Sequence, residues 1–522
     1  MPPKRQQAIS KKASSSRQSD GISGSRTSSG NRKRKASPSK GTETGKKVRE
    51  RKETPPILTH APTRRLNVYV FGTNYYGELG LGDATNEVIV REPIVNPKLR
   101  AETIGVVQIA AGRSHSVALT HDNRILTWGV NDDGQLGRDT GAKSKSKKAR
   151  KSSDKNNAEE SDTEELGLLD ESTPMPVDSS HFPDGTVFTQ VVATDNATFA
   201  LTNQGLVYGW GTFLNSKNDR ILGFSAEGES QKTPRQVPNL KKVIKLAAGA
   251  QHVLALTSAG SIFTWGCGDR GQLGRRLLGR LNRPTGLVPG QCALPKNIVD
   301  IGTGLYHSFA IRRDGKVYAW GANNYGQPGH TRGAGHTDAG VPYPTEVRIF
   351  RNHAQLTFIL GGRDHSIAVT EQGQCLAWGR INQKALGILL KDIPPSKTIY
   401  GAHSEPLILK EPTVIQGISG KVVHATAGGN HSIAVTEEGE AYSWGLNAQN
   451  RAGHTDFWIE LPTRLQNEHV KGKKLVAAAA GEQFSLLAGE YQPDHPRQAE
   501  ADSAENFARY LGLFNDVNDS LS

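Results

Sequence analysis

The sequence predicts an all-β fold, a seven-bladed β-propeller whose ring is closed by pairing of an N-terminal and a C-terminal half-blade. One pattern recurs along residues 66–489: a Gly-x-x-His block, a strand-like run ending in Trp-Gly, and a Gly-Gln-Leu-Gly element. Glycine is enriched, with 57 of 522 residues, or about 11% against ~7% in ordinary proteins. Repeats of roughly 55 residues with several short strands are typical of propeller blades.

A pair formed by a large aromatic residue and glycine ends one strand in every unit. Six of the seven tryptophans occupy this single position, which excludes chance as the explanation. The seven pairs are Phe71-Gly72, Trp128-Gly129, Trp210-Gly211, Trp265-Gly266, Trp320-Gly321, Trp378-Gly379 and Trp444-Gly445.

Within a unit, two runs rich in β-branched and aromatic residues are separated by a polar turn, as in residues 115–120 and 124–128. This pattern predicts a hairpin. The array begins in mid-unit at residues 68–71 and ends in the complementary half-unit at residues 480–487. We expect the two halves to join in one sheet, because a closed ring leaves few exposed strand edges.

The formal net charge of +13 is concentrated in residues 1–65, which hold 18 basic and four acidic residues, a net +14. About −1 remains for the rest of the chain, which excludes a uniformly basic globule. The segment has almost no large apolar residue, so it predicts a disordered basic tail. A low-complexity stretch at 139–172 predicts a disordered insertion between the second and third units.

Residues 490–522 form a predicted C-terminal tail. Four apolar residues in it have helical spacing and predict a short helix that docks on the ring. They are Phe507, Tyr510, Leu511 and Phe514.

Cys267, Cys292 and Cys375 are too few for a disulfide framework and lack C-x-x-C spacing. We therefore expect a reducing compartment, no metal and no cofactor. No apolar run approaches 18 residues and no signal peptide is recognisable, so we expect neither membrane insertion nor secretion.

Five units carry a histidine at one repeated position, which metal binding or acid–base chemistry would explain. We interpret these side chains as structural, because a function usually breaks the symmetry of a repeat. They are His115, His252, His307, His365 and His431, with Ala197 and Phe484 in the other two units.

The third unit breaks the symmetry in two places. Asp195 lies just before its second strand, and an elongated polar segment follows Trp210-Gly211 where other units have a short loop. An ordinary surface loop is the alternative reading of this segment. Its central residues are Asn215, Ser216, Lys217, Asn218 and Asp219.

These repeats resemble the regulator of chromosome condensation family over residues 66–489, and the insertion suggests a fungal-type member. The resemblance implies a chromatin-bound guanine nucleotide exchange factor for a Ran-type small GTPase. Such a factor generates nuclear Ran-GTP for nucleocytoplasmic transport and for spindle and chromosome control. The resemblance also implies that residues 215–219 form the tip of a β-wedge that loosens bound nucleotide.

By the same resemblance, Asp195, Gln251 and Asp364 occupy exchange positions on the GTPase-facing loops. Asp195 matches an acidic position, whereas Gln251 replaces an acidic residue and Asp364 stands at a histidine position. Exchange needs no covalent chemistry, and no glycine-rich stretch here is a P-loop, so the sequence predicts neither an enzyme nucleophile nor a GTPase.

Three alternatives remain beside the exchange factor. A propeller of this fold can serve as an interaction scaffold without exchange activity. The ultraviolet-photoreceptor branch is disfavoured because no tryptophan neighbours the repeated histidines. A propeller hydrolase would need an acid–base pair that the sequence does not reveal.

The basic tail contains two clusters spaced like a bipartite nuclear import signal, which an import receptor would bind. The same charges suit nonspecific contact with the DNA backbone of a nucleosome, and a merely solvated charge run is the alternative. We therefore predict a nuclear, chromatin-associated protein. The clusters are Arg32, Lys33, Arg34 and Lys35, and Lys46, Lys47, Arg49, Arg51 and Lys52.

Two modification sites are predicted in the tail, methylation of the Pro2 nitrogen, which the resemblance implies, and phosphorylation of Ser37 before a proline. The resemblance further implies that a loop after the fourth unit reaches the acidic patch of histones, with surface solvation as the alternative. Its arginines are Arg275, Arg276, Arg280 and Arg283.

Overall fold

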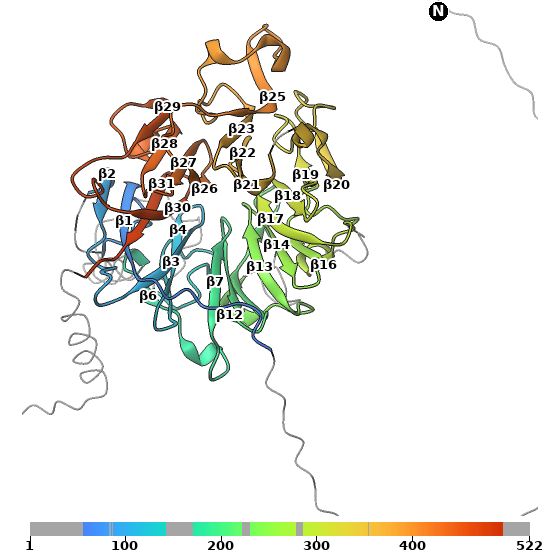
Figure 1. The fold of residues 1–522 in the computed structure, drawn as a ribbon. Helices are drawn as coiled ribbons and strands as arrows, with labels where there is room; N and C mark the ends of the chain where they lie inside the picture. Colours follow the sequence, from blue (N-terminus) through green and yellow to red (C-terminus); the bar gives the residue numbers. More distant parts are fainter. Residues whose placement is uncertain are drawn as a thin grey trace, which may run out of the picture. The chain divides into compact units, whose positions relative to one another are not determined.

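The computed structural model describes residues 56–82, 85, 87–141, 171–221, 230–277, 285–352 and 354–493. These residues form seven antiparallel blades that follow one another around a ring (Figure 1). We number the blades as the sequence units, so that blade 1 contains Phe71 and blades 2–7 follow in chain order. The predicted seven-bladed propeller is confirmed.

Each blade has an inner strand on the central channel and a second strand that carries the repeated histidine position. The inner strands of blades 1–7 are β30 (Leu475–Ala480), β3 (Val106–Ala111), β7 (Phe188–Ala193), β13 (Val243–Ala248), β17 (Ile298–Thr303), β21 (Leu356–Gly361) and β26 (Val422–Ala427). The second strands are β31 (Phe484–Glu490), β4 (His115–Thr120), β8 (Ala197–Thr202), β14 (His252–Thr257), β18 (His307–Arg312), β22 (His365–Thr370) and β27 (His431–Thr436).

The third strand of each blade ends at or just after the aromatic-Gly pair, and the outer strand varies most in length. The third strands are β1 (Leu66–Thr73), β5 (Ile125–Gly129), β9 (Val207–Gly211), β15 (Ile262–Gly266), β19 (Val317–Ala322), β23 (Cys375–Arg380) and β28 (Ala441–Leu446). The outer strands are β2 (Ile89–Val95), β6 (Met175–Pro176), β12 (Gln231–Gln236), β16 (Gly290–Gln291), β20 (Gly340–Glu346), β25 (Pro406–Val414) and β29 (Trp458–Arg464).

The remaining elements are short. Blade 6 has an additional edge strand, β24 (Thr398–Tyr400), and one two-stranded hairpin, β10 (Phe213–Leu214) and β11 (Arg220–Ile221), lies outside the blades. None of the helices in the described part of the chain could span a membrane. The 3-10 helices are η2 (Ser179–His181), η3 (Thr285–Leu287), η4 (Arg348–Asn352), η5 (Leu390–Asp392), η6 (Pro395–Lys397) and η7 (Ala448–Asn450).

Blade 1 is assembled from both ends of the propeller sequence. Strand β1 pairs with β31 through a continuous antiparallel register that runs from Leu66 opposite Glu490 to Gly72 opposite Phe484. The chain itself does not connect these two strands, so hydrogen bonds and packing alone close the ring, as the two half-units predict.

Glycine at the end of the Gly-Gln-Leu-Gly element lets successive blades approach each other. Gly137 has φ +69°, and a Cβ there would lie 2.7 Å from Nε1 of Trp210 in the next blade. Gly274 stands in the same relation to Trp320, also at 2.7 Å. Any side chain at these positions would push the next blade away.

The repeated histidines bond across the blade junctions. Nε2 of His252 lies 2.9 Å from Oγ of Ser308 in the next blade, and this hydroxyl donates to the carbonyl oxygen of Gln272 at 3.0 Å. Nε1 of Trp320 donates to the same carbonyl at 2.8 Å. The corresponding His–Ser or His–Thr bonds are His115–Thr198, His307–Ser366, His365–Ser432 and His431–Ser485. The structural interpretation of the histidines is confirmed.

The junction between blades 3 and 4 lacks this link. Ala197 and Val253 stand where other junctions have histidine and serine, and Nε1 of Trp265 has no hydrogen-bond partner in the described residues. Aromatic packing replaces the polar link, because Phe199 stacks on Phe213 and meets Trp265 edge to face. Phe213 belongs to the β10–β11 hairpin, so the hairpin is built into this junction.

Two sets of connections share one face of the ring, because all blades are antiparallel. These are the loops from inner to second strand and those from third to outer strand, and we call this the loop face. The opposite face carries the turns between second and third strands. Residues 57–65 lie there: the Leu58 amide donates to the Asn203 carbonyl at 2.7 Å, and Arg65 bonds His121 at 2.7 Å.

Candidate functional site

The two features that break the symmetry of the third unit lie together on the loop face. Asp195 is in the loop between β7 and β8, and the polar segment after β9 forms the β10–β11 hairpin. Residues 215–219 are the tip of this hairpin. The structure therefore contains a two-stranded hairpin at the position where the sequence predicts a wedge.

The hairpin tip is held by the Asn215 side chain. Its Oδ1 accepts hydrogen bonds from the amides of Lys217 and Asp219, both at 2.9 Å, and its Nδ2 donates to the Asp219 carboxylate at 2.9 Å. Asn218 has φ +62°, a conformation that asparagine tolerates in tight turns. The tip is therefore a fixed turn that presents exposed polar side chains.

Gln251 ties the hairpin to the loop of Asp195. The Leu214 amide donates to Oε1 of Gln251 at 2.6 Å, and Nε2 of Gln251 donates to Oδ1 of Asn196 at 2.8 Å. A longer bond of 3.4 Å reaches the Asp195 carboxylate. Gln251 is only 8% exposed, so its amide acts inside the chain, with both its donor and its acceptor used. A carboxylate here could not donate to Asn196.

Asp195 lies among charged side chains at the mouth of the central channel. Burial raises the pKa of its carboxyl to about 7, which nearby Arg113 and Arg363 oppose and Glu482 reinforces. Glu482 is itself ion-paired with Arg363. The carboxyl of Asp195 is thus partly protonated at neutral pH, and a further cation beside it would favour its charged form.

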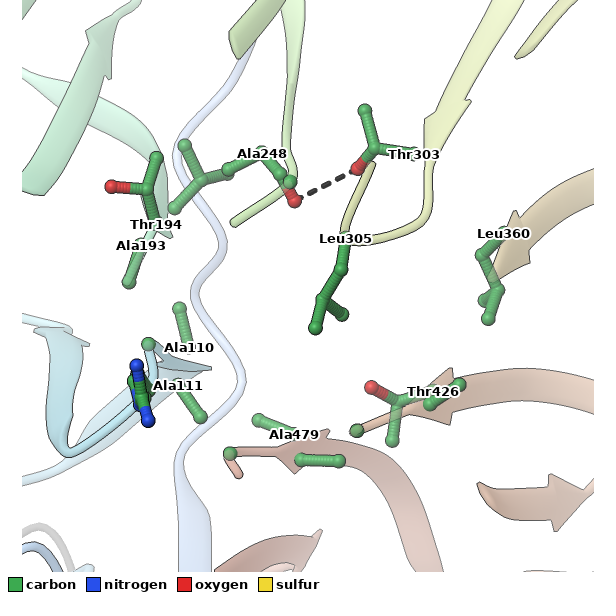
Figure 2. A pocket seen from close by; sticks show the side chains of 18 of the residues that line it. Ala110, Ala111, Ala193, Thr194, Ala248, Thr303, Leu305, Leu360, Thr426 and Ala479 are labelled. Atoms are coloured by element: carbon green, nitrogen blue, oxygen red, sulfur yellow. Dashed lines mark hydrogen bonds between the residues drawn. The ribbon is translucent and has the colours of Figure 1, made fainter. Parts of the chain in front are cut away.

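The channel behind Asp195 is narrow and lined mainly by small side chains (Figure 2). Ala110, Ala193, Ala248 and Ala479 face its lumen, and the Thr303 hydroxyl donates to the Ala248 carbonyl at 2.8 Å. The cavity measures about 290 Å³. The described residues contain no group of three or more His, Cys, Asp or Glu side chains that could hold a metal.

Backbone hydrogen bonds link the loops around the channel mouth. The Asp195 amide donates to the Ala250 carbonyl at 2.8 Å, the Ala250 amide to Leu305 at 2.9 Å, and the Leu305 amide to Gly362 at 2.9 Å. This chain of bonds ties the loops of blades 3–6 to one another. Asp195 is consequently displayed on a rigid rim.

Asp364 lies on the same face but is not brought together with the hairpin. Its carboxylate accepts a hydrogen bond from Arg380 Nη1 at 3.0 Å and is only 8% exposed. The Arg380 guanidinium lies over the Tyr325 ring, 4.5 Å from its centroid. Burial raises the pKa of Asp364, although Arg380 opposes this shift. Asp364 is thus already paired within blade 6.

An exposed aromatic pair on the loop face was missed by the sequence reasoning. Tyr75 and Tyr76 are 67% and 52% exposed, and their rings meet edge to face with centroids 4.8 Å apart. With Val88 and Ile89 they line a cavity of about 590 Å³ that extends to Asp195. The signal was present in the repeat, because this loop in blade 2 has two aspartates where blade 1 has two tyrosines.

Arg275 does not belong to a free histone-binding loop. Its guanidinium donates to the backbone carbonyls of Thr264 and Val288, at 3.1 and 2.9 Å. These bonds brace blade 4, whose outer strand β16 has only two residues. Arg138 bonds the Thr127 carbonyl in the same way at 3.2 Å and braces blade 2, where β6 is equally short. We interpret Arg275 and Arg138 as structural residues, because the outer strands of blades 4 and 2 are too short to hold the blade edge by themselves.

Several predicted features lie outside the described residues. These are the tail clusters, Pro2, Ser37, Arg280, Arg283, the proposed C-terminal helix and most of the 139–172 insertion. The ends of the insertion are described, and Oγ1 of Thr140 donates to the Glu171 carboxylate at 2.9 Å. The insertion therefore leaves and re-enters blade 2 at one point.

Two proteins are similar in sequence to most of this chain. The chain is 38% identical over 436 residues to Protein pim1 of Schizosaccharomyces pombe, which covers 83% of this chain and 76% of that protein. It is 33% identical over 449 residues to the guanine nucleotide exchange factor SRM1 of Saccharomyces cerevisiae, covering 84% and 91%.

Two solved structures agree in fold. The crystal structure of Prp20p from Saccharomyces cerevisiae, studied for its binding to Gsp1p and histones, matches with a TM-score of 0.74 and 30% identity, covering 86% of this chain and 97% of that one. Yeast RCC1 (Prp20) bound to Kap60 matches with a TM-score of 0.74 and 29% identity, covering 89% and 99%. The RCC1-like domain model matches residues 67–487, and the chain belongs to this family.

Proposed function

We propose that this chain is the guanine nucleotide exchange factor for a Ran-type small GTPase and that it works on chromatin in the nucleus. The observation that carries the proposal is the β10–β11 hairpin beside Asp195, at the junction of blades 3 and 4, where Ala197 and Val253 replace the histidine and serine and Trp265 Nε1 has no partner in the described residues. The relative SRM1 is an exchange factor, and the neighbour Prp20p binds Gsp1p.

Exchange by such a site is a matter of differential binding. The factor accelerates nucleotide release when it binds the nucleotide-free GTPase more tightly than the loaded form. Bound nucleotide lowers the affinity of the GTPase for the factor by the same ratio as the factor lowers its affinity for nucleotide. The fixed turn of residues 215–219 suits this role because a rigid projection pays little ordering entropy on contact. No covalent bond is made or broken, so the residues of the loop face act by binding the GTPase and displacing its nucleotide.

Asp195 contributes electrostatically to binding of the GTPase. A basic side chain of the GTPase placed at the channel mouth would favour the ionised carboxylate, whose pKa burial holds at about 7. The aromatic pair Tyr75 and Tyr76 adds apolar area on the other side of Asp195. Together these residues offer a charged centre with an aromatic border, an arrangement that resembles protein interfaces.

The partners beyond the GTPase follow from the tail and the relatives. Prp20p was studied for its binding to histones, and Kap60 binds yeast RCC1. In this chain, we assign import-receptor and DNA-backbone contacts to the basic clusters of residues 32–35 and 46–52. We place the protein in the nucleus on this basis.

Release of a fluorescent guanine nucleotide from purified Ran tests the proposal. The full chain should accelerate release, and replacement of residues 215–219 by a Gly-Ser sequence of equal length should abolish most of the acceleration. A double change in a turn on the opposite face, Glu437→Ser with Glu438→Ser, is the matched control and should behave as the parent. A parent chain that binds Ran without accelerating release would instead identify a scaffold.

A further inference from the structure

The base of the β10–β11 hairpin is enclosed by a circuit of four hydrogen bonds. On one side Arg220 of β11 donates to the Asp133 carboxylate at 2.5 Å, and Asn196 donates to the other oxygen of that carboxylate at 2.7 Å. On the other side Gln251 donates to Asn196 at 2.8 Å and accepts from the Leu214 amide of β10 at 2.6 Å. The path leads from one hairpin strand to the other through blades 2, 3 and 4.

The circuit combines buried and exposed groups. The Asp133 side chain is 9% exposed and both of its carboxylate oxygens are used, whereas Arg220 is 42% exposed. Removing the carboxylate would leave the Asn196 amide and the guanidinium without these acceptors. Charge-assisted bonds of this kind fix a geometry more firmly than neutral ones.

The symmetry of the repeat singles out Asp133. Asp133 lies in the loop after the third strand of its blade. In four blades the backbone amide of the residue at the corresponding position donates to the side chain of the Gln or Glu two residues later, so these four loops have the same turn. The residues at the position are Tyr76, Asp133, Arg270 and Tyr325. Only the blade next to Arg220 of the hairpin carries a carboxylate there among these four. The local backbone does not require it, so the hairpin accounts for it.

We propose that Asp133 and Asn196 are positioning residues for nucleotide exchange, which hold the hairpin in a fixed orientation relative to Asp195. Asn196 adjoins Asp195 in the chain, so the circuit joins the hairpin directly to the loop that carries this carboxylate. Because the tip is a fixed turn, orientation of the base helps to set the position of residues 215–219, together with the bond from the Ser216 amide to the Asp269 carboxylate of blade 4 at 2.8 Å. The inference rests on the proposed function and assigns roles that need no contact with the GTPase.

The test combines exchange kinetics with amide hydrogen exchange on the full chain. D133A breaks the circuit from blade 2, and R220A breaks it from the exposed side of the hairpin, where folding is least affected. Each should lower kcat for nucleotide release about tenfold and leave KM within about threefold, since small misplacement of a catalytic element costs rate. Amides of residues 213–221 should exchange faster in both variants.

Three further variants sharpen the test. The double variant D133A/R220A should lose less than the product of the two single losses, because both changes break the Arg220–Asp133 pair. Each single change also removes a second bond, of Asn196 to Asp133 and of Arg220 to the Asp132 carbonyl. R220K keeps the charge and should retain most of the parent rate. The matched control is D122A, which removes the carboxylate of another Asp–Arg pair of blade 2, on the opposite face; it should equal the parent.

Unchanged kcat in both D133A and R220A, or losses that multiply in the double variant, would overturn the positioning role. A rise in KM alone would also overturn it, since this would mark Asp133 as a binding contact. A parent chain that fails to accelerate release would overturn the proposed function instead. Amide exchange, measured without a GTPase, would even then decide whether the circuit holds the hairpin.

Discussion

Nε2 of His307 lies 2.7 Å from Oγ of Ser366, and this buried hydrogen bond joins blade 5 to blade 6. The Ser366 hydroxyl donates its one hydrogen to the Gln327 carbonyl at 2.8 Å, so the imidazole must be the donor to Ser366. Burial keeps the imidazole neutral by lowering its pKa to about 3. The repeated histidines thus hold the ring together and leave exchange to the residues that break the repeat.

Replacing His307 by alanine should destabilise the propeller by about 2–4 kcal/mol, because it removes a buried hydrogen bond and leaves a cavity. Urea denaturation followed by tryptophan fluorescence measures this change. His336→Ala, at an exposed histidine of the same blade, should alter stability by less than ~0.5 kcal/mol. Equal losses in the two variants would contradict the structural role.

Stability should fall steeply as the pH drops from 6.5 to 4.5. Burial lowers the pKa of a set of imidazoles below 6.5, so the unfolded chain binds protons that the folded chain does not, and acid favours unfolding. Buried carboxyls with raised pKa values act in the opposite sense, but they are fewer. The imidazoles are His115, His252 and His307 at about 3, His365 and His424 at about 4, and His431, His330 and His454, whose pKa values burial also lowers; the carboxyls are Glu78 and Asp195 at about 7 and Asp364, whose pKa burial raises.

The variant H307Q tests this linkage one group at a time. Glutamine keeps a donor for Ser366 but does not titrate, so the pH dependence of the unfolding free energy should be shallower by about 1.4 kcal/mol per pH unit in this range. Denaturation at a series of pH values measures both slopes. Identical slopes for the parent and H307Q would mean that His307 is protonated equally in both states.

Two tryptophan variants probe the junction between blades 3 and 4. Trp320→Phe removes a hydrogen bond to the Gln272 carbonyl, whereas Trp265→Phe removes an indole whose nitrogen has no partner in the described residues. The loss of volume is the same. Trp320→Phe should therefore cost about 1 kcal/mol more than Trp265→Phe in denaturation experiments. The reverse order would show that the junction contains a link we have not identified.

Deleting residues 1–56 should weaken retention on nucleosomes and leave nucleotide release from Ran in solution unchanged. The reason is that the deleted segment carries most of the net positive charge, while the hairpin and Asp195 belong to the ring. The loss should diminish as salt rises, because counterion release drives phosphate binding. A pull-down at several salt concentrations measures it, and equal retention of both chains would contradict this division of roles.

The repeat made the architecture predictable. The seven aromatic-Gly pairs, six Trp-Gly and one Phe-Gly, predict the blade count. The half-units at residues 68–71 and 480–487 predict the pairing of β1 with β31 that the structure contains. The hairpin was also located, because an added polar segment in one unit of a regular array stands out. These features depend on patterns along the chain.

The contacts within the site could not be predicted in the same way. Gln251 acts through bonds to Leu214 and Asn196, which lie 37 and 55 positions away in the sequence. The sequence predicts Asp364 as a contact for the GTPase, yet in the structure its carboxylate is already ion-paired with Arg380. Such pairings arise from loops that tertiary folding brings to one face, and a repeat pattern says only that the loops exist.

The closure of blade 1 has a consequence for synthesis. Strand β1 emerges from the ribosome about 400 residues before its partner β31, so it must wait with an open edge while six blades form. The import signal proposed for the tail precedes both strands and is made first. A chain that terminates before Phe484 would thus contain the proposed import signal but leave β1 without its pairing strand. The open edge of β1 would then be exposed to quality-control proteases. Noncovalent closure makes completeness of translation a condition for a stable factor.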